Sequence, residues 1–468
     1  MKPLHIFRLC AIVITSLLIV SFIYPKNGIS IFGYHLDFAN FSDFFSNEEV
    51  KYADISSIIS DTTSLDEKEE ASTIKTDSLA IQHNAASLKL FRKFYLKLST
   101  SKDDGELIRI LHYGDSQIEA DRISGTLREK LQKKFGGSGV GIVPITEVSN
   151  ARSNVFIDAD NWLREEIIEK HHALKGHEYG LLGSVYTGDD SAKESWIKIR
   201  ENKQSSELQR NIGHIKLLYQ GNLNCKIKID DNNEENIKKE NDNNFSIYDL
   251  KSNDSMPSNI KLQFLTNKNI QLYGIALDGE SGVTVDNVSL RGSSGIDFLK
   301  MDSTLLKQQL KEMNTGMIIM QFGVNVVPNI VKDYSYYQKQ FSNQLAWFRK
   351  IAPNVAVLVI GVSDMSRKEK GAYVSYPNIE KIRNAMKQAA FANSCAYWDL
   401  YEVMGGQNSM PSWVKAKPSL ANKDYTHFNN RGAEIVGTKL YNALIDDYDC
   451  LLKKKTKNKI SAPLISKK

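Results

Sequence analysis

The sequence predicts an α/β protein with a parallel sheet covered by helices, a β-rich insert and an apolar N-terminal segment. Three observations support this fold class. Apolar, strand-length runs alternate with amphipathic, helix-length segments around residues 87–135 and again over 316–445. Residues 139–281 instead contain short alternating segments separated by polar turns. Strands that alternate with helices indicate a parallel sheet with helices on both faces, whereas successive short strands indicate a β-sandwich or jelly roll.

The N-terminal segment predicts a membrane anchor. Lys2 and Arg8 precede an apolar run from Leu9 to Tyr24, and Pro25 follows it. This run is a little shorter than the ~20 residues of a comfortable membrane span, but longer than many signal-peptide cores. No small-residue cleavage site follows, which favours an uncleaved signal anchor over a cleaved signal. Because the positive charges lie ahead of the run, we expect an extracytoplasmic protein anchored in the membrane, in the periplasm or cell envelope.

Composition allows two folded units with polar appendages, because the chain has 468 residues, of which 41% are hydrophobic and 25% charged. The net charge is +5, and the lysine-rich C-terminus is interpreted as a solvated tail. No basic stripe with interleaved aromatic residues is present, so nucleic acid is not expected as a partner. The predicted segments are an anchor (1–26), a stalk (27–84), a first α/β part (85–140), an inserted β-sandwich (141–283), a second α/β part (284–450) and a basic tail (451–468).

Hydrophobic spacing predicts the elements of the α/β part. In chain order they are a helix at 87–98, a strand at 107–113, a helix at 118–135, a strand at 316–322, a helix at 334–351, a strand at 355–362, a helix at 379–392, a strand at 396–400 and a helix at 429–445. The strands expected in the insert are 196–200, 212–219, 225–230, 260–264 and 270–277.

Two short motifs far apart in the chain carry groups for nucleophilic catalysis. Gly114-Asp115-Ser116 ends the first predicted strand, and Asp424-Tyr425-Thr426-His427 precedes the last predicted helix. A serine hydroxyl is a weak nucleophile until an imidazole accepts its proton, and a carboxylate orients that imidazole. A third motif, Gly323-Val324-Asn325, follows another predicted strand and can supply a donor to an oxyanion. Because open α/β sheets place their ligands at the carboxyl ends of strands, these motifs are expected to converge.

In this order, Gly114-Asp115-Ser116, Gly295, Gly323-Val324-Asn325 and Asp424-x-x-His427 resemble the four blocks of the SGNH (GDSL-type) hydrolase family, over roughly residues 105–140 and 285–447. The resemblance implies a flavodoxin-like three-layer α/β/α fold. It also implies that Ser116 is the nucleophile, His427 the general base and Asp424 the group that orients His427. The backbone N–H groups of Ser116 and Gly295 and the side-chain amide of Asn325 would form the oxyanion hole.

The chain departs from the family pattern at one position and is ambiguous at another. Val326 stands where the third block usually ends in aspartate, which keeps the oxyanion donor but removes a supporting contact. The second block offers two glycines, of which Gly295 fits the usual Ser-Gly pair and Gly292 is the second choice.

The position of the insert resembles the bacterial peptidoglycan O-acetylesterases, which carry a carbohydrate-binding-like β-sandwich after the serine block. The run 272–283 is similar to the segment by which that subgroup returns to the hydrolase domain. The resemblance implies a serine esterase that removes O-acetyl groups from an acetylated envelope glycan, peptidoglycan first, without cofactor or metal. Two alternatives stay open: an O-acetyltransferase working with a membrane O-acyltransferase partner, and an inactive glycan-binding protein.

Other side chains invite functional interpretations with less support. His171, His172 and His177 lack the cysteine or carboxylate spacing of a metal site. Tryptophans could stack on sugar rings, although packing in the core is the more frequent role; these are Trp196, Trp398 and Trp413. The four cysteines include no close pair, so the fold is not expected to depend on disulfides.

Overall fold

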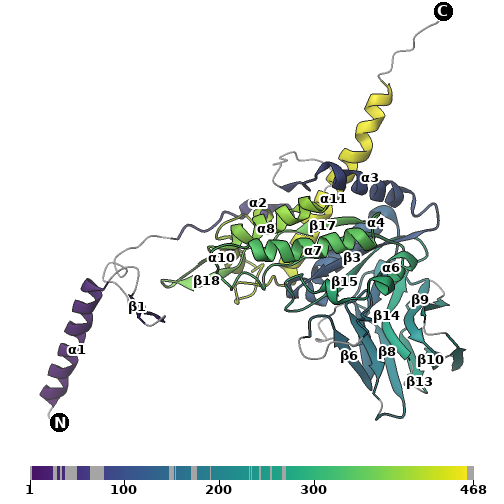
Figure 1. Ribbon diagram of the computed structural model, residues 1–468, viewed down its shortest axis with the longest axis horizontal. Coiled ribbons are helices and arrows are strands. Elements are labelled where there is room, and N and C mark those ends of the chain that lie inside the picture. Colours follow the sequence, from purple (N-terminus) through teal and green to yellow (C-terminus); the bar gives the residue numbers. More distant parts are fainter. Residues whose placement is uncertain are drawn as a thin grey trace, which may run out of the picture. The chain divides into compact units, whose positions relative to one another are not determined.

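The computed structural model describes residues 3–24, 29–31, 34–36, 50–63, 79–146, 152, 154–169, 176–189, 191–230, 232, 234–241, 244–252, 256–265 and 270–460. Much of the predicted stalk and the end of the predicted tail lie outside these residues. The chain forms two compact units, Met1–Tyr52 with Arg367–Val374, and Ala53–Ser366 with Ser375–Lys468. Figure 1 labels their helices and strands.

The first unit contains the apolar N-terminal helix α1 (Pro3–Ile23). Its segment Leu4–Ile23 is long and apolar enough to cross a membrane, and almost none of it is buried. This confirms an N-terminal helix of the signal-sequence or anchor type. Two small two-stranded sheets also occur here. One pairs β1 (Ile29–Ile31) with β2 (Tyr34–Leu36), and the other pairs β18 (Ser366–Glu369) with β19 (Ala372–Ser375).

The second unit is built on a five-stranded parallel sheet. Its strands lie in the order β15 (Gly282–Ser289), β3 (Leu107–Gly114), β16 (Thr315–Gln321), β17 (Ala356–Ile360) and β20 (Ala396–Trp398). All neighbouring strands are parallel. Numbered along the chain, the strand order is 2-1-3-4-5, which is the flavodoxin-like order. The predicted α/β class is therefore confirmed.

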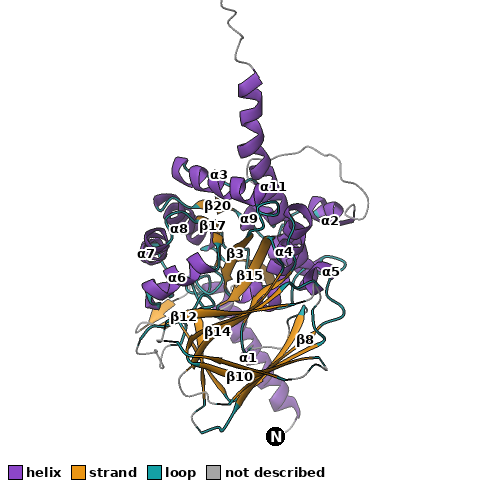
Figure 2. Ribbon diagram, turned by 90° about the vertical axis from the view of Figure 1, so that its right-hand side faces the viewer, coloured by secondary structure: helices purple, strands orange, loops and turns teal. Residues whose placement is uncertain are grey.

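Helices cover both faces of this sheet (Figure 2). One face carries α3 (Ala85–Thr100), α4 (Arg122–Phe135) and α11 (Asn430–Ile460), and the other carries α6 (Ser303–Glu312), α7 (Ser335–Ile351) and α8 (Ile379–Ala392). Successive side chains of a strand point to opposite faces, so Ile108 and Ile110 of β3 join the first core while Leu111 and Tyr113 join the second. Shorter helices are α2 (Ser56–Thr63), α5 (Glu207–Arg210), η4 (Phe298–Lys300), α9 (Leu400–Val403) and α10 (Ser409–Lys415).

The insert is a sandwich of two antiparallel sheets around an apolar core of its own. One sheet consists of β11 (Glu235–Lys239), β10 (Leu223–Ile229), β13 (Asn259–Phe264), β8 (Ser195–Glu201) and β5 (Val155–Asp160). The other consists of β12 (Phe245–Lys251), β9 (His214–Gly221), β14 (Ile270–Asp278), β7 (Ser184–Gly188) and β6 (Trp162–Glu166), with β4 (Gly139–Val143) also paired to β14. The predicted sandwich is confirmed, while the domain limits stay a prediction.

A buried ion cluster joins the sandwich to the parallel sheet. Arg109 of β3 donates to Asp286 of β15 at 2.6 and 2.8 Å and to Asp278 of β14 at 2.6 Å. Burial raises the pKa of Asp286, although the Arg109 guanidinium acts in the opposite direction. β15 is not among the predicted strands, because Asp286 and Asn287 are polar and give it no continuous apolar run, yet both side chains are buried.

Two predicted helices differ at their ends. The helix expected from residue 118 begins at Arg122, after a 3-10 segment η3 (Ser116–Asp121), because Ala120 and Asp121 adopt left-handed φ angles of 63° and interrupt the helix. The helix expected to end at 445 continues to Ile460, since Tyr448, Leu451 and Leu452 still pack against the core.

Candidate active site

Ser116 lies where β3 ends and η3 begins. The turn needs glycine at 114, because a Cβ there would approach the Gln321 carbonyl oxygen to 2.9 Å. Asp115 caps η3, and its Oδ1 accepts a hydrogen bond from the Gln117 N–H at 3.0 Å. The turn thereby presents the side chain of residue 116 at the carboxyl edge of the central strand.

Ser116 and His427 are in direct contact, although 311 positions separate them. The Ser116 Oγ lies 2.8 Å from His427 Nε2. On the other side of the ring, His427 Nδ1 lies 2.8 Å from Asp424 Oδ2. The His427 side chain is 30% exposed and that of Asp424 48% exposed, so solvent reaches this chain of groups. The arrangement can move a proton from a hydroxyl to an imidazole that a carboxylate orients.

The loop Asp424–His427 is organised around the Asp424 carboxylate. Its Oδ1 accepts hydrogen bonds from the backbone N–H groups of Thr426 at 2.9 Å and His427 at 3.0 Å. Burial acts to raise the pKa of Asp424, but these backbone donors and the His427 ring outweigh it and lower the pKa below its ordinary value. The carboxylate is therefore held ionised against the imidazole.

Two side chains that were not predicted as site residues join the histidine loop (Asp424–His427) to the serine turn (Gly114–Ser116). Gln117 donates to the Thr426 carbonyl at 2.7 Å and accepts from the Phe428 N–H at 3.3 Å. Arg122 donates to the carbonyls of Phe428 at 2.7 Å and Ser116 at 3.1 Å. Both residues stand within six positions of Ser116, but nothing in their spacing indicates a partner three hundred residues away.

Of the three predicted oxyanion donors, the Ser116 N–H lies at the start of η3, and the other two, Gly295 and Asn325, lie around Ser293. The side-chain amide of Asn325 donates one N–H to the Ser293 carbonyl at 2.9 Å, and its second N–H has no acceptor in the described part of the chain. The Gly295 N–H donates to the Ser293 hydroxyl at 3.0 Å, so that donor is occupied within its own loop. Gly292, the second choice, is exposed, with open space on its Cβ side.

Asp115 is the most perturbed carboxyl group of the serine turn. The residue is 1% exposed. Burial raises its pKa to about 7, against the opposing effect of the backbone N–H groups of Gln117 and Val324. Val324 belongs to the third motif, so Asp115 links the serine turn to the loop that carries Asn325.

The remaining candidates lie outside this site. Trp398 and Trp413 are fully buried and bond backbone carbonyls, as expected for core tryptophans, and Trp196 is half-buried in β8. His171 and His172 lie outside the described residues. Among the residues that are described, no group of three or more His, Cys, Asp or Glu side chains is placed to hold a metal ion.

Comparison with solved structures identifies the fold. The structure of a peptidoglycan O-acetylesterase superposes with a TM-score of 0.64 and 17% identity, covering 80% of this chain and 99% of that one. The two proteins share one fold. The likeness bears out the expected fold, and at this identity it shows the fold alone.

Other solved structures align over smaller parts with low scores. A GDSL-like lipase from Bacteroides thetaiotaomicron aligns with a TM-score of 0.26 and 14% identity, over 35% of this chain and 76% of that one. A family two carbohydrate esterase from Cellvibrio japonicus gives a TM-score of 0.26 and 9% identity, over 64% and 99% of the respective chains. No protein-family model and no curated protein matches the sequence.

Proposed function

We propose that this protein is a serine esterase that removes O-acetyl groups from a cell-envelope carbohydrate, with peptidoglycan as the first candidate. The observation that carries the proposal is the contact of 2.8 Å between Ser116 Oγ and His427 Nε2. The fold shared with a peptidoglycan O-acetylesterase over most of both chains supports the choice of substrate.

In the proposed reaction, Ser116 Oγ attacks the acetyl carbonyl while His427 Nε2 accepts the hydroxyl proton. Asp424 keeps the other ring proton on Nδ1 and stabilises the imidazolium that forms. Collapse of the tetrahedral intermediate transfers the proton from Nε2 to the departing sugar oxygen and leaves an acetyl-enzyme. Water, deprotonated by the same imidazole, then attacks the acetyl group and releases acetate, which restores Ser116.

The negative charge of the tetrahedral intermediate requires donors that are already in place. We propose the Ser116 N–H, the Gly295 N–H and the Asn325 amide for this role. The second N–H of Asn325 has no acceptor among the described residues and is available to the substrate. The Gly295 N–H must first exchange its bond to the Ser293 hydroxyl for one to the substrate.

We further propose that α1 anchors the protein in a membrane, with the hydrolase fold on the extracytoplasmic side. Its apolar segment Leu4–Ile23 supports this placement. The same helix also supports the second candidate function, an O-acetyltransferase that receives acetyl groups from a membrane O-acyltransferase. In that case a sugar hydroxyl replaces water in the second half of the reaction.

The test is acetate release from several acetylated polymers by the full-length protein in detergent micelles, with Ser116→Ala as the control. An esterase releases acetate, and the variant loses almost all turnover because, among the described residues, Ser116 supplies the hydroxyl that contacts His427 Nε2. Transfer of acetyl groups to an added glycan without acetate release would establish the transferase instead. A folded wild-type protein that neither turns over nor reacts at Ser116 with a fluorophosphonate would contradict both activities and favour an inactive glycan-binding protein.

A further inference from the structure

A pocket lies between the serine turn and the sandwich. Glu119, Ser289 and Arg291 line it from the α/β part, and Arg152 and Arg164 line it from the insert. It adjoins the candidate active site, because Glu119 belongs to η3, which begins at Ser116, and the Ser289 hydroxyl donates to the Asp115 carbonyl at 3.3 Å. A glycan that places an acetyl group at Ser116 therefore has this pocket beside its neighbouring groups.

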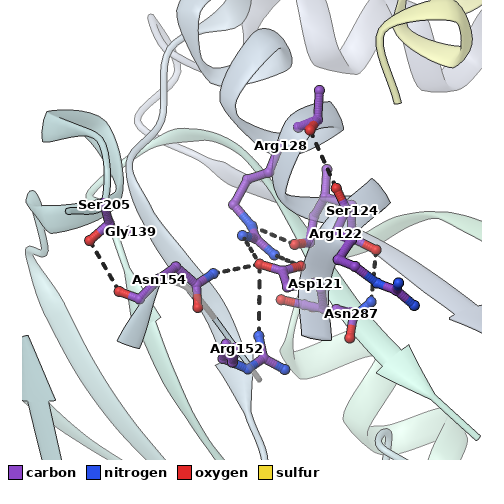
Figure 3. Close-up of polar contacts among 12 residues, drawn as sticks. Asp121, Arg122, Ser124, Arg128, Gly139, Arg152, Asn154, Ser205 and Asn287 are labelled. Carbon is purple, nitrogen blue, oxygen red and sulfur yellow. Dashed lines mark hydrogen bonds and ion pairs between the residues drawn. The ribbon is translucent and has the colours of Figure 1, made fainter. Parts of the chain in front are cut away.

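The walls of the pocket are tied together by the buried carboxylate of Asp121 (Figure 3). Arg128 donates to it with two hydrogen bonds of 2.6 and 2.8 Å, and Asn154 from the insert donates at 2.5 Å. Arg152 lies 3.8 Å from the same carboxylate, and its side chain is only 4% exposed. These contacts hold the end of the serine turn and the first segment of the insert in a fixed relation, so the pocket is built in advance of any ligand.

The charges around the pocket favour an anion. Arg152 and Arg128 share the single carboxylate of Asp121. Arg164 contacts Glu166 and donates to the Thr146 carbonyl at 3.3 Å, but its buried Nε has no acceptor in the part of the chain that is described. Arg291 lies 3.5 Å from Glu119. The described residues that line the pocket include three arginines, Arg152, Arg164 and Arg291, and one carboxylate, Glu119, so the lining is positively charged.

Arg291 is the residue best placed to engage a ligand. Its side chain is 61% exposed, and its ion pair with Glu119 is long. It also stands next to Gly292, in the loop that carries Gly295. A guanidinium recognises a carboxylate with paired hydrogen bonds, so a ligand carboxylate can replace Glu119 as its partner.

From these contacts we infer that the pocket is a subsite for a carboxylate carried by the acetylated glycan, and that Arg291 is the main residue that binds this carboxylate. The inference rests on the proposed function, because it assumes that the glycan reaches Ser116. Peptidoglycan carries such carboxylates on its peptide stems, and on its lactyl groups where the stem is absent. A neutral acetylated polysaccharide has no carboxylate to bind at this site, so the pocket selects an acidic substrate.

The experiment measures binding without turnover. Full-length protein carrying Ser116→Ala is titrated with fluorescent O-acetylated peptidoglycan strands, and with the same strands after conversion of their carboxyl groups to amides. We expect the acidic strands to bind about five- to tenfold more tightly, which corresponds to one charge-assisted contact at a partly exposed site. The preference is expected to weaken as salt is added.

Variants in this background separate a ligand contact from a structural role. Arg291→Gln is expected to abolish the preference for acidic strands. Glu119→Gln is expected to increase it, because the competing carboxylate is gone, and a purely structural role of the ion pair predicts no such increase. Arg200→Gln is the matched control, since Arg200 of β8 forms a surface ion pair with Asp158 of β5 and does not line the pocket.

Equal affinity for both strands, or a preference that survives Arg291→Gln, would overturn the inference. The proposed function fails separately, when wild-type protein releases no acetate from the acidic strands. Because affinity is measured without catalysis, the binding result and the acetate-release result can be interpreted independently of each other.

Discussion

Replacing Asp424 by asparagine tests the proposed relay most directly. Asp424 Oδ1 accepts two backbone N–H groups, at 2.9 and 3.0 Å, while Oδ2 faces His427 Nδ1 at 2.8 Å. In Asp424→Asn the single oxygen stays with the two backbone donors, because they cannot bond an amide N–H. The amide nitrogen then faces Nδ1, which has to accept, and the ring proton moves to Nε2. There it points at Ser116 Oγ, and the imidazole can no longer take the serine proton.

The wrong tautomer lowers kcat by about 10³- to 10⁴-fold in hydrolases with this arrangement, which corresponds to about 4–5.5 kcal/mol in the barrier. We expect a loss of this size in Asp424→Asn, with KM little changed, because residue 424 lies behind the imidazole as seen from Ser116. Asp424→Ala removes the carboxylate without imposing the wrong tautomer, so its loss should be no larger than that of the asparagine variant.

The assay is hydrolysis of p-nitrophenyl acetate by full-length protein, accompanied by the rate of fluorophosphonate labelling and by circular dichroism to verify folding. Both rates depend on the same deprotonation of Ser116 and should fall together. An asparagine variant that keeps kcat within about tenfold of wild type, or one much more active than the alanine variant, would refute the tautomer argument.

Two further predictions concern stability. Asp115 has its pKa raised by burial to about 7, so its neutral form is favoured by folding, and stability should decrease by up to about 4 kcal/mol as pH rises from about 4 to 7. Asp115→Asn should remove this contribution in urea unfolding, whereas the separate decrease due to Asp364, whose pKa burial raises to about 6, should remain; parallel stability curves for variant and wild type would contradict the assignment. Arg109→Met should lower the free energy of unfolding by about 3–5 kcal/mol, because Asp278 and Asp286 are left buried without their cation. Arg200→Met, at an exposed ion pair, should cost less than about 1 kcal/mol, and an equal loss in the two variants would disprove the role of the buried cluster.

The sequence was most informative where local pattern and local chemistry coincide. The apolar run of β3 followed by Gly114-Asp115-Ser116 predicted a strand that ends in a sharp turn at the serine, because both signals lie within a few consecutive residues. Asp424 and His427 stand three positions apart, so their pairing within one loop also follows from local geometry.

The hydrophobic pattern predicted wrong strand and helix limits where buried side chains are polar. β15 was not expected, because Asp286 and Asn287 interrupt its apolar character. Donors from elsewhere in the chain, the Arg109 guanidinium and the Ile142 N–H, stabilise the buried Asp286 carboxylate. The start of α4 was placed too early for a similar reason, since Asp121, one of the two left-handed residues that interrupt the helix, is buried and its carboxylate accepts hydrogen bonds from Arg128 and Asn154.

The sequence by itself determined the class of the sheet, the presence of an inserted sandwich, the apolar N-terminal helix and the identity of the candidate triad. Tertiary structure alone decided that Gln117 and Arg122 fasten the histidine loop to the serine turn, that the Gly295 N–H is occupied by Ser293, and that arginines from two parts of the chain surround one pocket. The physical reason is that periodicity and turn chemistry act between near neighbours, whereas hydrogen bonds and ion pairs join whichever side chains the packed core brings within about 3 Å of each other.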